Sequence, residues 1–240
     1  TTTTNDASAT GVGTIDSVYQ ANTTSGFSIV TWSGTGSAGT IAHGLGAVPK
    51  MIVVKTRDSS SNSWIVYHHE MGASPEDLRM FWDSNDASGT STDNFNSTAP
   101  TSTVFSVGDI SATNGGSNTY LAYCFAEVEG YSKFGSYASN NSSDGVFVHL
   151  GFRPAWLMIK LASASGEDWH MFDNKRATYN VMKARLIGNG TAQENTNDEI
   201  IDFLSNGFKL RDNNDGYNGS SKTYIYMAFA ENPFKYSNAR

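Results

Sequence analysis

The sequence predicts an all-β fold made of two tandem, duplicated β-sandwich modules, jelly-roll-like, with at most one or two short helices. The first observation is a repeat: TYLAYCFAE at 119–127 returns 104 positions later as TYIYMAFAE at 223–231. The second is composition. Only 16% of the residues are charged, while Gly, Ser, Thr and Asn are abundant, and small polar residues compete with helical backbone bonding. The third is a series of short apolar runs between turn residues, which is typical of strands.

The repeat also predicts the domain organisation. Other landmarks keep nearly the same separation: Lys55 returns as Lys160, Trp64 as Trp169 and Phe105 as Phe208. A period of about 100 residues is too long for a solenoid unit and has the length of one compact domain. We therefore expect a lead-in arm over 1–25, a first module over 26–129 and a second module over 130–240.

The expected strands recur in the same order in both copies. In the first copy they cover 27–32, 51–55, 63–68, 80–82, 103–107 and 120–126. In the second they cover 131–137, 145–149, 156–161, 169–172, 208–211 and 224–230. The last run of each copy is apolar without clean alternation, so we expect these two strands to be central and covered on both faces.

Two stretches carry helix signals. Ser74 followed by Pro75 has the pattern of an N-cap and a first helical residue, with acidic residues in the next two positions. Residues 176–187 place Tyr179, Met182 and Leu186 on one helical face before Gly188. These are the only helices that we expect.

Charge, hydropathy and cysteine content exclude several classes. The net charge of −7 argues against a surface that binds nucleic acid. No run approaches the ~20 apolar residues of a membrane helix, so membrane insertion is not expected. Cys124 is the only cysteine, which excludes an internal disulfide, and its apolar surroundings predict a buried residue. Thr1 stands where a start methionine would, so we expect a piece of a longer polypeptide.

One oxygen-rich string is a candidate calcium site. Asp212, Asn214 and Asp215 carry the carboxylate and amide oxygens that calcium prefers, but the string lacks the downstream Glu of an EF-hand loop. The alternative is turn formation, because Asn, Asp and Gly bond locally and tolerate positive φ. The adjacent His68 and His69 point to opposite faces of a strand and cannot share a metal without distortion. No other cofactor is predicted.

The tryptophans provide the candidates for ligand binding. Trp64 and Trp169 occupy matching positions, so we expect both in the cores of their modules. Trp32 and Trp82 lack a Trp partner in the other copy. Each could be a surface platform for the face of a sugar or a buried packing residue.

Catalytic residues are not predicted. The best carboxylates are Glu127, Glu129 and Glu231, of which Glu127 and Glu231 look like equivalent strand-end positions that serve a salt bridge or a turn. No nucleophile elbow, phosphate-binding loop or zinc-protease helix is present in the sequence. We therefore expect a protein that is not an enzyme, with a glycan depolymerase as the alternative.

Several strings resemble a known family. They are GFSIVTW at 26–32, HGLG at 43–46 with Pro49, CFAEVEGYSKFGSY at 124–137, GFRPAW at 151–156 and FLSNGFKL at 203–210. Together they resemble a domain found at the C-terminal ends of large virion structural and tail-fibre proteins of tailed bacteriophages, many of them marine. The resemblance spans about residues 26–236 and implies an extracellular, multi-copy virion part without a transferable catalytic motif.

The expected function follows from this resemblance. It is a non-enzymatic virion structural protein, a tail fibre, knob or surface appendage used for host attachment by receptor binding. A capsid decoration or cement protein is the alternative. The expected location is the external surface of the virion. The expected partners are other virion proteins, further copies of this chain in a homo-oligomer, with a trimer favoured, and a host-surface glycan.

Overall fold

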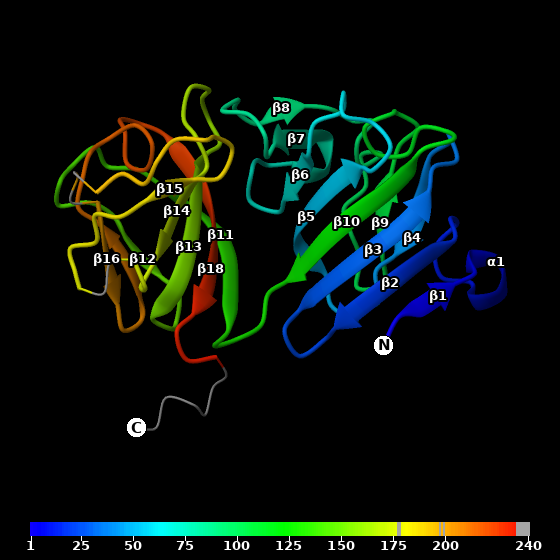
Figure 1. The fold of residues 1–240 in the computed structure, drawn as a ribbon, viewed down its shortest axis with the longest axis horizontal. Helices are drawn as coiled ribbons and strands as arrows, with labels where there is room; N and C mark the ends of the chain where they lie inside the picture. The colour runs from blue at the N-terminus through cyan, green and yellow to red at the C-terminus, as the bar shows by residue number, and fades with distance from the viewer. Residues whose placement is uncertain (177–178, 197, 199, 234–240) are drawn as a thin grey trace. The chain divides into compact units, whose positions relative to one another are not determined.

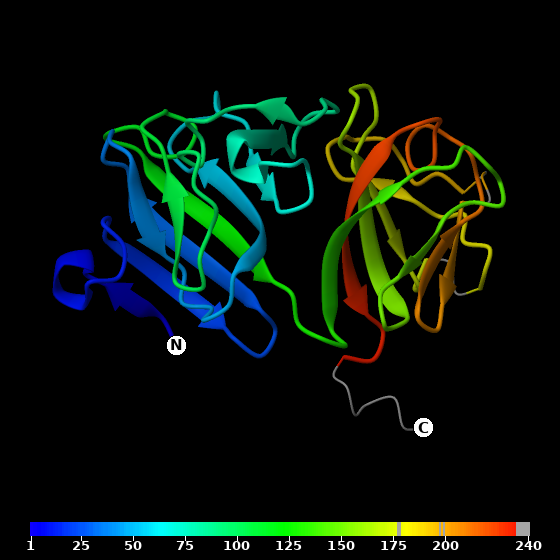
Figure 2. The ribbon, with the colours of Figure 1, turned by 180° about the vertical axis from the view of Figure 1, so that it is seen from behind.

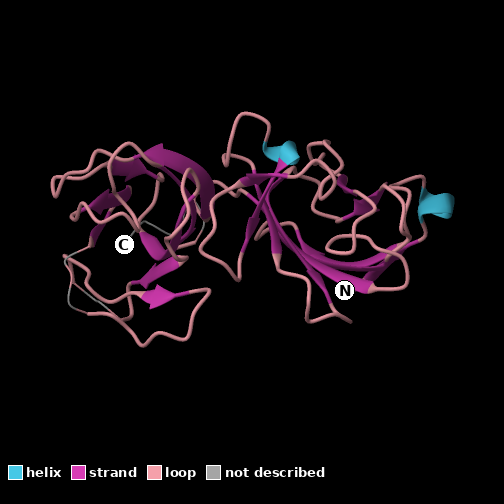
Figure 3. Ribbon diagram, turned by 90° about the horizontal axis from the view of Figure 1, so that it is seen from above, coloured by secondary structure: helices cyan, strands magenta, loops and turns pink. Residues whose placement is uncertain are grey.

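The computed structural model describes residues 1–176, 179–196, 198 and 200–233. Its regular structure is almost entirely antiparallel strand, which confirms the predicted all-β fold (Figure 1). Two short helices occur in the described residues, α1 (Ala7–Thr10) and the 3-10 turn η1 (Pro75–Asp77) (Figure 3). No helix in this part of the chain is long and apolar enough to cross a membrane.

The chain divides into two compact units. Unit 1 comprises Thr1–Trp82 and Ser88–Glu127, and unit 2 comprises Asp83–Ala87 and the chain from Val128 onward. The division after Glu127 lies two residues before the expected boundary. The short segment Asp83–Ala87 belongs to unit 2 although its neighbours in sequence belong to unit 1.

Unit 1 is built on an eight-stranded antiparallel sheet. Its strands lie in the order β1 (Thr3–Asn5), β2 (Ser17–Asn22), β3 (Phe27–Ser33), β10 (Thr119–Ala126), β5 (Pro49–Thr56), β6 (Ile65–His68), β7 (Leu78–Phe81), β8 (Gly89–Thr90). A second layer, formed by β4 (Gly39–Ala42) and β9 (Val104–Val107), lies over one face of this sheet (Figure 2). The ring of Trp32 in β3 meets that of Phe105 in β9 edge to face, with centroids 5.7 Å apart, so the core lies between the two layers.

Residues 1–25 contribute two strands to the unit 1 sheet, whereas the sequence predicts a lead-in arm. β1 pairs with β2, and β2 pairs with β3 along its whole length. Asp6 caps α1 by accepting a hydrogen bond from the Ala9 amide at 3.1 Å, and Asp16 Oδ1 accepts one from the Ala7 amide at 2.8 Å. This segment has few large apolar residues. It is held in place by backbone pairing and by short polar side chains.

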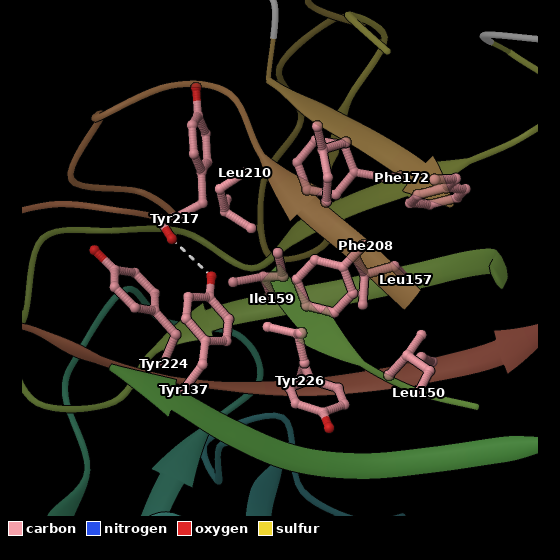
Figure 4. Close-up of a cluster of buried hydrophobic side chains, with 14 of the residues drawn as sticks. Tyr137, Leu150, Leu157, Ile159, Phe172, Phe208, Leu210, Tyr217, Tyr224 and Tyr226 are labelled. Atoms are coloured by element: carbon pink, nitrogen blue, oxygen red, sulfur yellow. Dashed lines mark hydrogen bonds between the residues drawn. The ribbon is translucent and has the colours of Figure 1, made fainter. Parts of the chain in front are cut away.

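Unit 2 is a sandwich of a five-stranded and a three-stranded sheet. The first has the order β11 (Ser132–Ala138), β18 (Thr223–Ala230), β13 (Pro154–Leu161), β14 (His170–Asp173), β15 (Leu186–Ile187), and the second β12 (Phe147–His149), β17 (Gly207–Leu210), β16 (Ile201–Leu204). Side chains from both sheets fill the space between them (Figure 4). Phe208 of β17 packs against Tyr137 of β11 and Tyr226 of β18, and the Tyr137 hydroxyl donates to the Tyr217 carbonyl at 2.6 Å.

The two units share a strand order. The run β3, β10, β5, β6 in unit 1 corresponds position by position to β11, β18, β13, β14 in unit 2, and the pair β4–β9 corresponds to β12–β17. The strands β10 and β18 are central in their sheets, as the sequence predicts. The matched order agrees with the repeat, and an origin by duplication stays a prediction.

The helix predictions have mixed outcomes. The start at Pro75 is present as the three-residue turn η1, although Ser74 makes no side-chain cap bond. The prediction of a helix at 176–187 is wrong for the described residues, since Met182 bridges to Ile201 and Leu186–Ile187 form β15. The Met182 amide donates to the Ile201 carbonyl at 2.8 Å. This amide is therefore paired with β16 and not with a carbonyl of its own helical turn. Residues 177 and 178 lie outside the described residues.

Candidate functional site

Unit 1 carries an aromatic pocket on the sheet face that points away from its core. The pocket has a volume of about 240 Å³ and is lined by Val53, Trp64, Trp82, Tyr123 and Phe125. Buried and partly exposed residues alternate strictly along β10, which explains why Tyr123 and Phe125 form the base of the pocket. Tyr123 and Phe125 are partly exposed, whereas Ala122, Cys124 and Ala126, which alternate with them, are buried on the core side.

The rings around the pocket form a row. Tyr123 lies nearly parallel to Trp64, with an interplanar angle of 9° and centroids 6.4 Å apart. Phe27 of β3 stacks beside Tyr123 at 6.1 Å and 20° and touches Phe125 at 4.9 Å. The paired strands β3 and β10 hold Phe27 and Tyr123, and Trp64 directly precedes β6, so the rings need little reordering to receive a ligand.

Pairing between β6 and β7 brings the two pocket tryptophans together. Ile65 faces Phe81 in the register, and the Trp82 amide donates to the Trp64 carbonyl at 3.0 Å. Lys55 supplies a cation at the rim, with Nζ 5.9 Å from the centre of the Trp64 ring and a hydrogen bond to the Asn62 carbonyl. The pocket therefore combines apolar ring faces with one positive group.

The two predicted ligand-binding tryptophans have different places. Trp82 is partly exposed and lines the aromatic pocket. Trp32 is only 4% exposed and stacks on Tyr120 with centroids 5.3 Å apart, so the packing alternative describes it. Trp32 faces Tyr120 in the pairing of β3 with β10, on the side of the sheet that packs against Phe105 of β9.

Trp64 is the pocket residue that sequence reasoning misplaced. Its repeat partner Trp169 is 2% exposed and lies in the core, but Trp64 is partly exposed and lines the pocket. Tyr123 and Phe125 were also missed. Their alternation with the small Ala122 and Cys124 was the available signal, because period-two spacing indicates two different faces.

Unit 2 carries a polar cavity of about 490 Å³. Its walls include Glu167, Asp168, His170, Arg185, Asn214 and Asp215. Two of the three predicted calcium ligands, Asn214 and Asp215, thus line one cavity, together with side chains far away in the sequence. The third, Asp212, bonds the Tyr217 hydroxyl through Oδ2 at 3.2 Å and is not among the residues that line the cavity.

Local bonding accounts for much of the oxygen-rich string. Asp212 Oδ1 accepts from the Asn214 amide at 3.0 Å, and Asn214 Oδ1 accepts from the Gly216 amide at 2.8 Å. Asp215 pairs with Lys222 at 3.1 Å. Across the described residues, no three His, Cys, Asp or Glu side chains are grouped to hold a metal ion. Turn formation, the alternative to calcium, explains these contacts.

Electrostatics in the cavity keep His170 neutral. Its side chain is almost fully buried, and burial lowers the pKa of the imidazole to about 4, with a further contribution from the Arg185 charge. Burial raises the pKa of Glu167, and the neighbouring Asp215 charge adds to this shift. At neutral pH the cavity thus presents an uncharged imidazole beside carboxylates.

The carboxylates weighed as catalytic candidates lie at strand ends. Glu127 follows the last residue of β10, and Glu231 follows the last residue of β18. Glu231 pairs with Arg153 at 3.2 Å and accepts a hydrogen bond from Asn174 at 2.8 Å. These contacts are the salt-bridge role that the sequence offered as the alternative to catalysis.

Two further residues have structural surroundings. His43 is fully buried, with Nε2 3.1 Å from the Thr101 carbonyl and Nδ1 accepting from the Leu45 amide at 3.3 Å. It therefore holds a turn next to Gly44, whose φ is +71°. Cys124 is buried as predicted, and burial raises the pKa of its thiol, which suppresses the reactive thiolate.

Comparisons with known proteins give a family and no named relative. No curated protein and no solved structure matches the chain. The resemblance to tailed-phage virion proteins is not tested by these comparisons and stays a prediction. The profile of a domain family of unknown function, DUF7483, matches residues 2–233, nearly the whole chain. The chain belongs to this family.

Proposed function

We propose that the protein is a non-enzymatic surface component of a phage virion that attaches to a host-surface glycan through the aromatic pocket of unit 1. The observation that carries the proposal is the row of rings built from Phe27, Tyr123 and Trp64, with Trp82 and Phe125 beside it. The resemblance to virion proteins supplies the location. The fold by itself does not indicate a reaction.

The chemistry of a pyranose ring fits such a row. One face of the ring presents C–H groups that pack on aromatic faces, while the hydroxyl groups at its edge stay available for hydrogen bonds. Binding sites of this kind are mostly apolar, with a few polar groups that set orientation. Lys55 at the rim of the Trp64 ring is one such group. A row of several rings can contact successive sugars of a chain.

Attachment by weak sites gains from repetition. A homo-oligomer, for which we favour a trimer, presents several aromatic pockets to one polymer, so that later contacts form at high effective concentration. Millimolar sites can then hold a particle on a cell surface. This arrangement is part of the proposal, together with the expected contacts to other virion proteins.

The test compares polymer retention with polymer cleavage. Purified protein is incubated with a panel of bacterial envelope polysaccharides, and bound polymer and released oligosaccharides are both measured. We expect retention of intact polymer. Trp64→Ala and Trp82→Ala each should weaken retention at least about tenfold, the effect of losing one aromatic anchor.

Trp156→Ala is the matched control. Trp156 is a partly exposed tryptophan in β13 of unit 2 that packs on Phe229 at 5.9 Å. Its loss should leave retention unchanged. Release of oligosaccharides that disappears in Glu127→Gln or Glu231→Gln would instead identify a depolymerase. If the protein neither retains nor cleaves any polymer, a capsid cementing role replaces attachment, with buried contacts above ~1,200 Å² to neighbouring subunits.

A further inference from the structure

The polar cavity of unit 2 contains a buried side chain whose hydrogen bonds are not satisfied. His170, the first residue of β14, is 4% exposed and lines the cavity. Among the described residues, neither Nδ1 nor Nε2 of its ring has a hydrogen-bond partner. Buried polar atoms in native proteins are nearly always paired, so such an exception indicates a missing ligand or solvent group.

A gap separates His170 from the nearest carboxylate. Nε2 lies 4.0 Å from Glu167 Oε2, which is too long for a direct hydrogen bond. Gly216 borders this gap. A methyl group on Gly216 would lie 2.5 Å from His170 Nε2 and 3.1 Å from both Glu167 Oε2 and Asn214 Oδ1. Three polar atoms thus converge on a space that any larger residue would fill.

The backbone does not require glycine at this position. The φ angle of Gly216 lies outside the left-handed region, whereas Gly166 has a φ of +107°. An alanine at 216 would therefore strain the side-chain packing and not the backbone. The open space beside His170 is the feature that distinguishes this glycine.

The other carboxylates of the cavity have partners of their own. Asp168 accepts from Asn189 at 2.8 Å, Asp215 pairs with Lys222 at 3.1 Å, and Glu194 pairs with Arg176 at 3.2 Å. Glu167 and His170 remain facing each other across the gap. A ligand group that donates to the carboxylate and accepts from an imidazole N–H would satisfy both.

A hydroxyl group fits this requirement better than a metal ion. A histidine that ligates a metal normally donates its second ring N–H to a carbonyl or carboxylate, and His170 Nδ1 has no such acceptor in the described part of the chain. The amide of Asn214 and the guanidinium of Arg185 add the neutral and donor groups that bind polyols. The volume of about 490 Å³ lies within the usual range for small-ligand sites.

We propose that this cavity binds a single carbohydrate ring, with one hydroxyl bridging His170 Nε2 and Glu167 Oε2. The site shares no residue with the aromatic pocket and belongs to the other unit. Its lining is mostly polar, so its contacts can distinguish the hydroxyl pattern of one sugar, whereas the aromatic row contacts only ring faces. The inference is independent of the proposed attachment through Trp64 and Trp82.

The test follows the His170 imidazole directly. Nitrogen-15 NMR of the side chains, with His170 assigned from a His170→Asn variant, is recorded during titration with glucose, galactose, mannose, rhamnose and N-acetylglucosamine. Calcium and zinc chloride are titrated separately. We expect at least one sugar to shift the His170 signals in a saturable way, with neither metal doing so.

Two variants alter the space between His170 and Glu167: Gly216→Ala fills it, and Glu167→Gln removes the charge of the acceptor. Two further variants are controls. Gly216→Ala and Glu167→Gln should each lower the affinity for that sugar at least about tenfold, the cost of losing a hydrogen bond to a charged group. Gly89→Ala, where an added methyl meets open space, and Trp82→Ala should leave it unchanged. If Gly216→Ala fails to fold, Glu167→Gln still tests the inference, because the Glu167 side chain is partly exposed and its substitution disturbs the packing less.

Three outcomes would overturn the inference: no sugar shifts His170, Glu167→Gln binds as tightly as the native protein, or a metal alone saturates the signals. Failure of polymer retention in Trp82→Ala with unchanged monosaccharide binding would separate the two sites. Loss of monosaccharide binding alone would leave the attachment proposal standing.

Discussion

The strands β10 and β18 hold corresponding central places in the two units, yet they differ in exposure. In β10, buried residues alternate with partly exposed ones, so that Tyr123 and Phe125 build the aromatic pocket. In β18, five consecutive residues are buried, and Met227, which corresponds to Tyr123, is 5% exposed. The prediction of cover on both faces is confirmed for β18 and wrong for β10. A shared backbone position does not determine what lies on the outer face.

A lysine pair shows the same difference. Lys55 in β5 is partly exposed above the Trp64 ring, whereas its counterpart Lys160 in β13 is fully buried. Lys160 Nζ donates to the Asp86 carbonyl at 2.9 Å and to the Leu161 carbonyl at 2.8 Å. Asp86 belongs to Asp83–Ala87, the segment that forms part of unit 2. Burial lowers the pKa of Lys160 to about 8.

The largest expected effect tests whether the two cores are equivalent. Phe105 and Phe208 occupy matching positions in β9 and β17 and are 1% and 0% exposed. Phe105→Ala and Phe208→Ala should each lower the free energy of unfolding of the affected unit by about 3–5 kcal/mol, through lost burial and the cavity that remains. Urea unfolding followed by unit-specific NMR signals measures both values. A difference above about 2 kcal/mol between them would show that the cores are not equivalent.

The next effect uses the lysine pair. A lysine in the unfolded chain keeps a pKa near 10.5, whereas Lys160 in the folded protein has a pKa of about 8. Between these values the unfolded chain binds more protons, so stability should rise with pH from about 8 to 10, by no more than about 3 kcal/mol. Above pH 10 the buried tyrosines, whose pKa values are raised, act in the opposite direction.

Matched substitutions isolate this contribution. Lys160→Met should abolish the rise in stability between pH 8 and 10, and Lys55→Met should preserve it. Unfolding free energies from denaturant titrations at each pH provide the comparison. An unchanged slope in Lys160→Met would mean that another group causes it.

The smallest stability effect is expected at Trp82, one of the two tryptophans that the sequence selected. Trp82→Ala should change the free energy of unfolding by about 1 kcal/mol or less, because Trp82 is partly exposed. Trp32→Ala should cost about 3–5 kcal/mol, because Trp32 is buried between Tyr120 and Phe105. Thermal unfolding of the two variants measures the contrast. Equal losses would remove the distinction between a surface residue and a core residue.

The sequence by itself determined the all-β class, the positions of most strands and the central places of β10 and β18. Local patterns carry this information, because strand periodicity, turn residues and the repeat are properties of short segments. It also named Trp82 as a candidate ligand-binding residue and Glu231 as a strand-end position with a salt bridge or a turn bond. Each of these depends on the residue and its immediate neighbours.

Only the tertiary structure decided which sheet faces and side chains remain exposed. It paired β1 and β2 with the unit 1 sheet, exposed Trp64 while burying Trp169, and paired Met182 and Leu186–Ile187 with strands where a helix was expected. It also brought Glu167 and His170 next to Asn214 and Gly216, more than forty positions later in the chain. Exposure and long-range convergence depend on what packs across a sheet or a loop, and no single segment of sequence contains that partner.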